Sequence, residues 1–97
     1  MIIAYILKDC YYSESAEKLL KKNKIKFIKH LVPQDENIKN KLKKKNKMST
    51  FPQIFFKDDN ILKIFKIGGY NDLNQYFDLK KEIKDKKLNK NLCKYII

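Results

Sequence analysis

A continuous apolar run, from Ile2 to Leu7, constrains the fold of this chain more than any other segment. An unbroken run of this kind is typical of a strand that is buried on both faces, as in an α/β sheet. It is much shorter than the ~20 apolar residues that span a bilayer. It has no basic segment before it and no small-residue cleavage pattern after it, as a signal peptide would. We therefore expect a soluble, cytoplasmic protein built around a buried first strand, with no membrane partner.

Strand-like and helix-like patterns alternate along the rest of the chain. A strand, a crossover helix and a second strand pair in parallel, and a later hairpin extends the same sheet in antiparallel fashion. The expected class is therefore α/β, with a four-stranded mixed sheet and three flanking helices in the order β-α-β-α-β-β-α. We expect strands over residues 2–7, 25–32, 53–56 and 61–67, a turn over residues 57–60, and helices over residues 11–23, after Asp35 and from about Asn71.

Each predicted helix carries an apolar stripe at helical spacing. A chain of 97 residues has room for one domain. We assign that domain to residues 1–87 and interpret residues 88–97 as a basic, loosely ordered tail. The stripes consist of Tyr12, Ala16, Leu19 and Leu20 in the first helix, Ile38 and Leu42 in the second, and Leu73, Tyr76, Phe77 and Ile83 in the third.

The net charge of +12 suggests a nucleic-acid partner at first sight, because basic patches follow phosphate backbones. All 23 basic residues are lysine, however, and none offers the bidentate contacts of arginine. Lysine, asparagine and isoleucine are frequent throughout, a pattern typical of an A+T-rich genome. We interpret the dense run over residues 41–47 as a solvated helix face, and expect the charge to attract anionic substrates rather than nucleic acid.

Cys10 lies where the first strand ends and the first helix begins. Unpaired N–H groups and positive potential at a helix N-terminus favour a thiolate over a thiol, and Lys8 lies close enough in sequence to add to the effect. The thiolate is the nucleophile in disulfide exchange. The position of Cys10 alone allows either this reactive role or an inert, buried cysteine.

Three motifs occur in a fixed order on these elements. They are Cys10-Tyr11-Tyr12-Ser13 after a strand, Thr-Phe-Pro-Gln-Ile-Phe over residues 50–55 before a strand, and Gly-Gly-Tyr-Asn-Asp-Leu over residues 68–73 at the start of the last helix. Together they resemble the glutaredoxin family over about residues 2–77. The resemblance implies a thioredoxin-like fold with a glutathione groove around Cys10.

The resemblance assigns a role to the motif that contains Pro52. In glutaredoxins the matching proline is cis, and the backbone of the preceding residue, here Phe51, pairs with the cysteinyl part of glutathione. A cis X–Pro bond is tolerated at modest cost. Without the resemblance, Pro52 would be interpreted as an ordinary trans residue at the start of a strand.

Further glutathione contacts are implied for Asn71, Asp72, Lys8 and Tyr12. Backbone N–H groups of Asn71 and Asp72, at a helix start, would bind the γ-glutamyl carboxylate; the two residues also suit a plain helix cap. Lys8 would meet the glycine carboxylate, although many members place that residue three positions before the cysteine instead of two. Tyr12 would flank the groove, or simply join the core.

The active-site box departs from the family at two positions. Tyr11 stands where many members have proline, and Ser13 stands where dithiol members carry a resolving cysteine. We therefore expect a monomeric enzyme that reduces protein–glutathione mixed disulfides through Cys10, with glutathione as cosubstrate and disulfide-bonded or glutathionylated proteins as partners. The alternative is a homodimeric carrier that holds a [2Fe–2S] cluster with Cys10 and glutathione.

Two further residues carry side chains that suit redox or acid–base chemistry. His30, the one histidine, is interpreted as a surface residue near a strand end. Cys93 would resolve a mixed disulfide if the tail folded back, but we interpret it as a bystander. The interpretation as a monothiol enzyme requires no metal ion.

Overall fold

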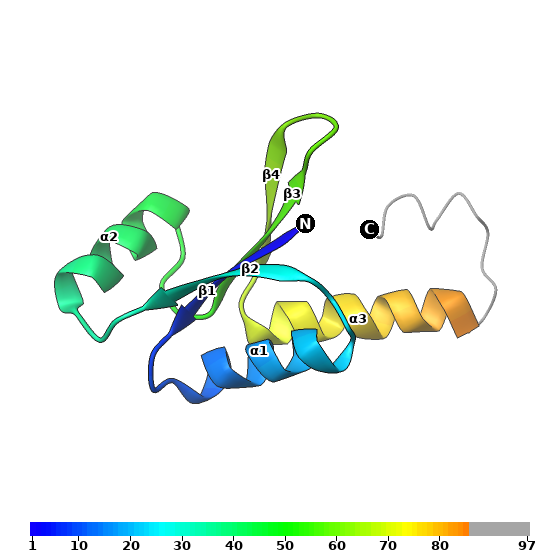
Figure 1. Cartoon of the computed structure of the whole chain (residues 1–97), viewed down its shortest axis with the longest axis horizontal. Coiled ribbons are helices and arrows are strands. Elements are labelled where there is room, and N and C mark those ends of the chain that lie inside the picture. Colours follow the sequence, from blue (N-terminus) through cyan, green and yellow to red (C-terminus); the bar gives the residue numbers. More distant parts are fainter. Residues whose placement is uncertain (86–97) are drawn as a thin grey trace.

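A mixed sheet of four strands and three helices make up the computed structural model, which describes residues 1–85 (Figure 1). The predicted order of elements and the predicted fold class are confirmed. In the part of the chain that is described, no helix is long and apolar enough to cross a membrane. The elements are β1 (Ile2–Leu7), α1 (Tyr11–Lys22), β2 (Phe27–Val32), α2 (Glu36–Asn46), β3 (Gln53–Asp58), β4 (Lys63–Gly68) and α3 (Tyr70–Asp85).

The sheet has the strand order β2-β1-β3-β4. β1 pairs with β2 in parallel, and β3 runs antiparallel to both β1 and β4. The crossover through α1 and the later hairpin therefore join the sheet as the sequence predicts. The β3–β4 register shifts between Ile54 and Phe55, so that β4 is irregular close to its end at Gly68.

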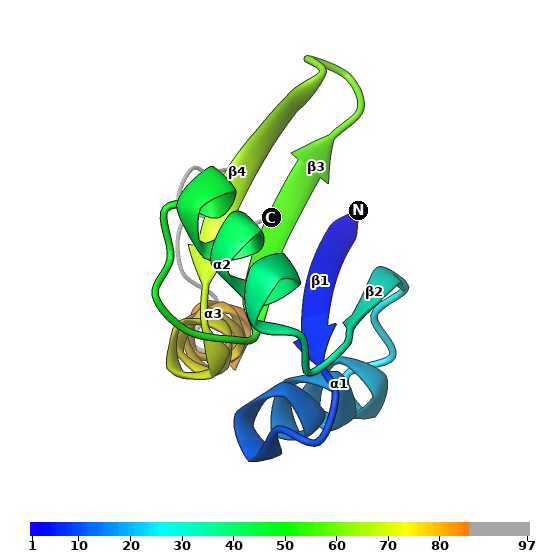
Figure 2. The same cartoon turned by 90° about the vertical axis from the view of Figure 1, so that its left-hand side faces the viewer.

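One face of the sheet carries the hydrophobic core. α1 and α3 lie together on this face (Figures 1 and 2), and Ile2, Ala4 and Ile6 of β1 point to it and are buried. The alternate residues of β1 are only half-buried. The expectation that β1 is buried on both faces is therefore met on one face only. The reason is α2, which lies apart beyond the ends of β1 and β2 and has no buried residue.

The apolar stripe of α1 differs by one position from the prediction. Ser13, Ala16 and Leu20 are the buried residues of this helix, whereas Tyr12 is 56% exposed. The placement of Tyr12 in the core is therefore wrong. In α3, Leu73 is buried as predicted. The side chain of Ile83, and the whole of Cys93, lie outside the described residues.

The β3–β4 hairpin is displaced by two residues from its predicted position. β3 continues through Asp58, because Oδ1 of Asp58 accepts a hydrogen bond of 2.9 Å from the N–H of Asn60 and so moves the turn toward Leu62. Leu62 has a positive φ of 53°, and β4 begins after it. The hairpin extends well beyond the other two strands (Figure 2).

Candidate functional site

Cys10 is the N-cap residue of α1, with extended backbone angles (φ −120°, ψ 121°). The first backbone bond of the helix runs from the N–H of Glu14 to the carbonyl of Cys10, over 2.9 Å. The three preceding N–H groups therefore have no partner within the helix. The Cys10 side chain makes no capping hydrogen bond and is partly exposed. Cys10 thus lies at the positive end of the helix dipole and is partly accessible to solvent.

Hydrogen bonds fix the short connection between β1 and Cys10. The Lys8 N–H donates to the carbonyl of Val32 over 2.8 Å, and the Leu7 N–H donates to Oγ of the buried Ser13 over 3.1 Å. Asp9, between them and Cys10, adopts a left-handed conformation with φ 55°. Ser13 therefore links the first turn of α1 to the end of β1 by this hydrogen bond. It occupies the position at which dithiol members of the family carry a resolving cysteine.

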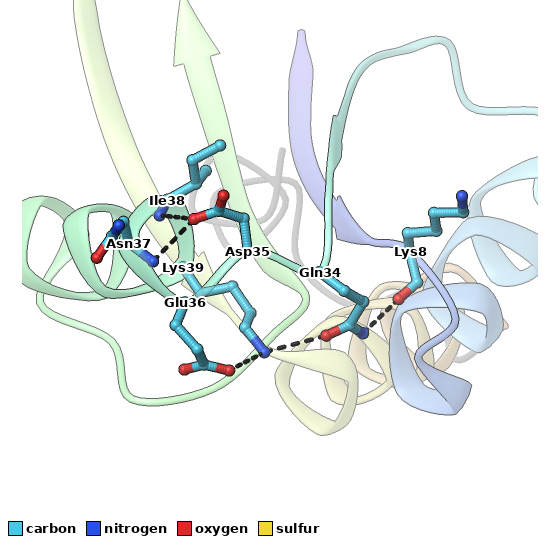
Figure 3. Close-up of polar contacts among 7 residues, drawn as sticks. All are labelled: Lys8, Gln34, Asp35, Glu36, Asn37, Ile38 and Lys39. Atoms are coloured by element: carbon cyan, nitrogen blue, oxygen red, sulfur yellow. Dashed lines mark hydrogen bonds and ion pairs between the residues drawn. The ribbon is translucent and has the colours of Figure 1, made fainter.

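The start of α2 is tied to the same connection (Figure 3). Nε2 of Gln34 donates to the Lys8 carbonyl over 2.6 Å, and Oε1 of Gln34 accepts from Nζ of Lys39 over 3.0 Å. Lys39 also pairs with Glu36 at 2.8 Å, and this hydrogen-bonded ammonium holds the pKa of Glu36 below its usual value. Asp35 caps the helix by accepting from two N–H groups, as predicted.

The peptide bond between Phe51 and Pro52 is cis, which confirms the expectation drawn from the resemblance. Both residues are buried. The adjacent Gln53 is also buried, and its side chain accepts from Asn46 over 2.8 Å and donates to the carbonyl of Thr50 over 3.3 Å. These bonds link the end of α2 to the loop that enters β3.

Two glycines form the junction between β4 and α3. Gly68 has φ 125°, and a Cβ atom at this position would collide with the carboxylate of Asp72. That carboxylate accepts a hydrogen bond of 2.9 Å from the Gly69 N–H. The first helical bond of α3 runs from Leu73 N–H to Gly69 carbonyl over 3.0 Å, so the N–H groups of the first turn have no partner within the helix.

A groove of about 620 Å³ lies where these segments meet. Four of the predicted site residues line it, namely Tyr12, Phe51, Asn71 and Asp72. It is also lined by residues 47–50, 66–69 and Tyr70. Tyr12 and Tyr70 lie close together within it, with ring centroids 6.2 Å apart.

Three predicted site residues, Lys8, Cys10 and Pro52, do not line the groove itself. Cys10 lies two residues before Tyr12 at the same helix end. The carbonyl oxygen of Pro52 lies 3.7 Å from the position that a Cβ atom on Gly69 would occupy. The Lys8 side chain is exposed and points away from Gln34 (Figure 3). A second hollow, of about 490 Å³, lies between α1 and α3 and includes none of the predicted site residues.

Sequence reasoning missed two cationic residues of the groove, Lys47 and Lys66. They lie 19 positions apart in the chain, on the end of α2 and on β4. No local pattern distinguishes them from the many other lysines. Only the fold brings them to one wall.

Residues 2–61 match the family model for glutaredoxin. The chain belongs to the glutaredoxin family. Glutaredoxins are thiol–disulfide oxidoreductases that use glutathione, and the three motifs named above lie on the elements where the resemblance places them. No curated protein matches this chain in sequence.

Two solved glutaredoxin structures share the fold. Glutaredoxin 1 from Francisella tularensis, in a crystal structure of its complex with cacodylate, has a TM-score of 0.64 and 25% sequence identity, covering 79% of this chain and 91% of that one. The solution structure of glutaredoxin from Brucella melitensis has a TM-score of 0.63 and 24% identity, covering 86% of this chain and 84% of that one. The fold is therefore thioredoxin-like, as expected.

Proposed function

We propose that this glutaredoxin reduces protein–glutathione mixed disulfides by a monothiol mechanism through Cys10. The observation that carries the proposal is the partly exposed Cys10 at the N-cap of α1, two residues before Tyr12, which lines a groove together with the residue before a cis proline. Ser13 supports the monothiol form, because its hydroxyl oxygen cannot form a disulfide. This oxygen instead accepts a hydrogen bond from the Leu7 N–H. We place the reaction in the cytoplasm and expect the enzyme to act as a monomer.

In the first step, the Cys10 thiolate attacks the glutathione sulfur of the mixed disulfide. A bond forms between Cys10 Sγ and that sulfur while the original S–S bond breaks, and the protein cysteine leaves as a thiolate that takes a proton from solvent. The substrate protein is thereby released in its reduced form.

In the second step, a glutathione thiolate attacks the glutathione sulfur of the Cys10 disulfide. The S–S bond to Cys10 breaks, Cys10 leaves as a thiolate, and glutathione disulfide is the product. In the net reaction, the mixed disulfide and one glutathione give the protein thiol and glutathione disulfide: the incoming glutathione sulfur is oxidised to the disulfide level, and the protein cysteine sulfur is reduced to a thiol. No intramolecular disulfide is needed, which is consistent with serine at position 13.

Two separate parts of the site would hold the glutathione moiety. The N–H groups of Asn71 and Asp72, at the start of α3, would bind the γ-glutamyl carboxylate, since helix N-termini bind anions. The backbone of Phe51 would pair with the cysteinyl part, and the ring of Tyr12 would flank it. Lys8 would have to turn its exposed side chain toward the groove to meet the glycine carboxylate.

The alternative proposal is a [2Fe–2S] carrier, for which the chain would have to contribute ligands to the cluster. Among the described residues, no group of three or more His, Cys, Asp or Glu side chains gathers as a metal ligand set. Each copy would therefore contribute Cys10 and depend on a bound glutathione for the second thiolate. Tyr11 and Tyr12, the two residues that follow Cys10 in the chain, are both exposed. Visible absorption by anaerobically purified protein would favour this alternative.

The decisive experiment measures turnover of a small glutathione mixed disulfide, coupled to reduction of the glutathione disulfide produced. We expect turnover by the wild-type chain and by Cys93→Ser, and none above background with Cys10→Ser. The Cys93→Ser variant is the matched control, because it removes the other thiol of the chain. Turnover that survives in Cys10→Ser would refute the proposal.

A further inference from the structure

Lys47 and Lys66 give one wall of the groove a positive charge. Lys47 ends α2 in a left-handed conformation with φ 52°, and Lys66 lies on β4. Nζ of Lys66 donates to the Lys47 carbonyl over 3.0 Å, which holds the ammonium group against the end of α2. Both residues are exposed and both line the groove.

Neither ammonium group has an acidic partner among the side chains that the structure describes, those of residues 1–81. Other lysines do: Lys21, Lys29, Lys39 and Lys57 each pair with an Asp or Glu side chain. Asp72 is the acidic residue that lines the groove, but its carboxylate accepts the Gly69 N–H at the start of α3. Lys66 retains two N–H donors after its bond to the Lys47 carbonyl. The lining of the groove therefore includes two lysines that are available to an anionic group.

We propose that Lys47 and Lys66 select, among glutathionylated proteins, those whose modified cysteine lies in an acidic segment. This inference rests on the proposed function, because it concerns the half of the mixed disulfide that is released. That proposal assigns the two carboxylates of glutathione to the start of α3 and to Lys8, whose exposed side chain would turn toward the groove. The two cations on the groove wall are then free for Asp or Glu side chains that flank the substrate cysteine.

The expected size of the effect follows from the exposure of both lysines. Pairs between exposed charges are weak and are screened by salt, but complementary charges also raise the rate of encounter. We expect the wild-type enzyme to favour an acidic over a neutral glutathionylated peptide by about three- to tenfold in kcat/KM at low salt. The preference should decline toward one at high salt.

The test uses two glutathionylated peptides that differ only in Asp and Glu against Ser and Gln beside the cysteine. The double variant Lys47→Asn/Lys66→Gln removes both charges: asparagine tolerates a positive φ, and glutamine keeps a donor for the carbonyl. The matched control is Lys41→Gln/Lys45→Gln, which removes the same charge from exposed positions of α2 that do not line the groove.

The readout is the ratio of kcat/KM between the two peptides, which cancels any general loss of folded or active enzyme. The ratio should fall to about one in the double variant and persist in the control. An unchanged ratio in the double variant, an equal fall in the control, or no acidic preference in the wild type would each overturn the inference. Lack of turnover of a small glutathione mixed disulfide by the wild type would instead remove the proposed function, and this inference with it.

Discussion

The change Gly68→Ala should destabilise the junction between β4 and α3. Gly68 has φ 125°, a region that side chains with a Cβ rarely adopt, and the added methyl group would collide with the Asp72 carboxylate. Asp72 would have to turn away. It would then give up the hydrogen bond of 2.9 Å that it accepts from the Gly69 N–H at the start of α3.

Two contributions set the size of this effect. Backbone strain in a sparsely populated region costs of order 1–3 kcal/mol. Loss of the hydrogen bond to a charged and exposed carboxylate adds roughly 1 kcal/mol. We therefore expect the free energy of unfolding to fall by about 2–4 kcal/mol. Each kcal/mol lowers the midpoint of thermal unfolding by roughly 4–8 °C in a domain of this size.

Urea unfolding of the wild type, Gly68→Ala and Gly69→Ala measures the effect. Gly69→Ala is the matched control, because its Cβ would meet only ordinary van der Waals neighbours, at 3.7 and 4.0 Å. We expect this control to lose less than about 1 kcal/mol, chiefly because alanine caps a helix less well than glycine. Equal losses in the two variants, or a loss below about 0.5 kcal/mol in Gly68→Ala, would refute the reasoning.

Two other substitutions test side-chain interactions of α1, the helix that has Cys10 as its N-cap. Ser13→Ala leaves the Leu7 N–H without its acceptor, and should lower the free energy of unfolding in urea by about 1–2 kcal/mol; Ser15→Ala, a control on the same helix, should not. A hydrogen bond of 2.8 Å from Lys29 holds the pKa of Glu17 below the usual value of a glutamate. Stability from this carboxylate is present above that value and is lost as the pH falls through the folded-state pKa. Glu17→Gln should therefore cost about 0.5–1 kcal/mol at neutral pH and little in acid, and a constant difference at every pH would contradict this.

The order of elements follows from local patterns, which is why the sequence predicts it. The run Ile2–Leu7 and the helical spacing of Ala16 and Leu20 require no knowledge of distant residues. Tyr12 and Ser13 show where local reasoning ends. A hydrophobicity pattern favours burying the tyrosine, whereas the structure buries the serine, since its hydroxyl accepts the Leu7 N–H.

Some features of the candidate site can be predicted from the sequence, and others cannot. The N-cap position of Cys10 follows from the boundary between strand and helix, and the cis bond before Pro52 follows from the family resemblance. The hairpin turn contains a hydrogen bond from the Asn60 N–H to the Asp58 side chain, which the pattern of apolar residues does not indicate. The wall formed by Lys47 and Lys66 depends on the tertiary fold, and no sequence pattern indicates it.

The central claim is that Cys10 is an accessible nucleophile toward glutathione disulfides. Its most direct test is peptide mapping by mass spectrometry after the reduced protein is incubated briefly with a limiting amount of glutathione disulfide. We predict one glutathione on the peptide that contains Cys10, formed faster than any adduct on Cys93, and no adduct at position 10 in Cys10→Ser. Modification of Cys93 while Cys10 stays free would contradict the account.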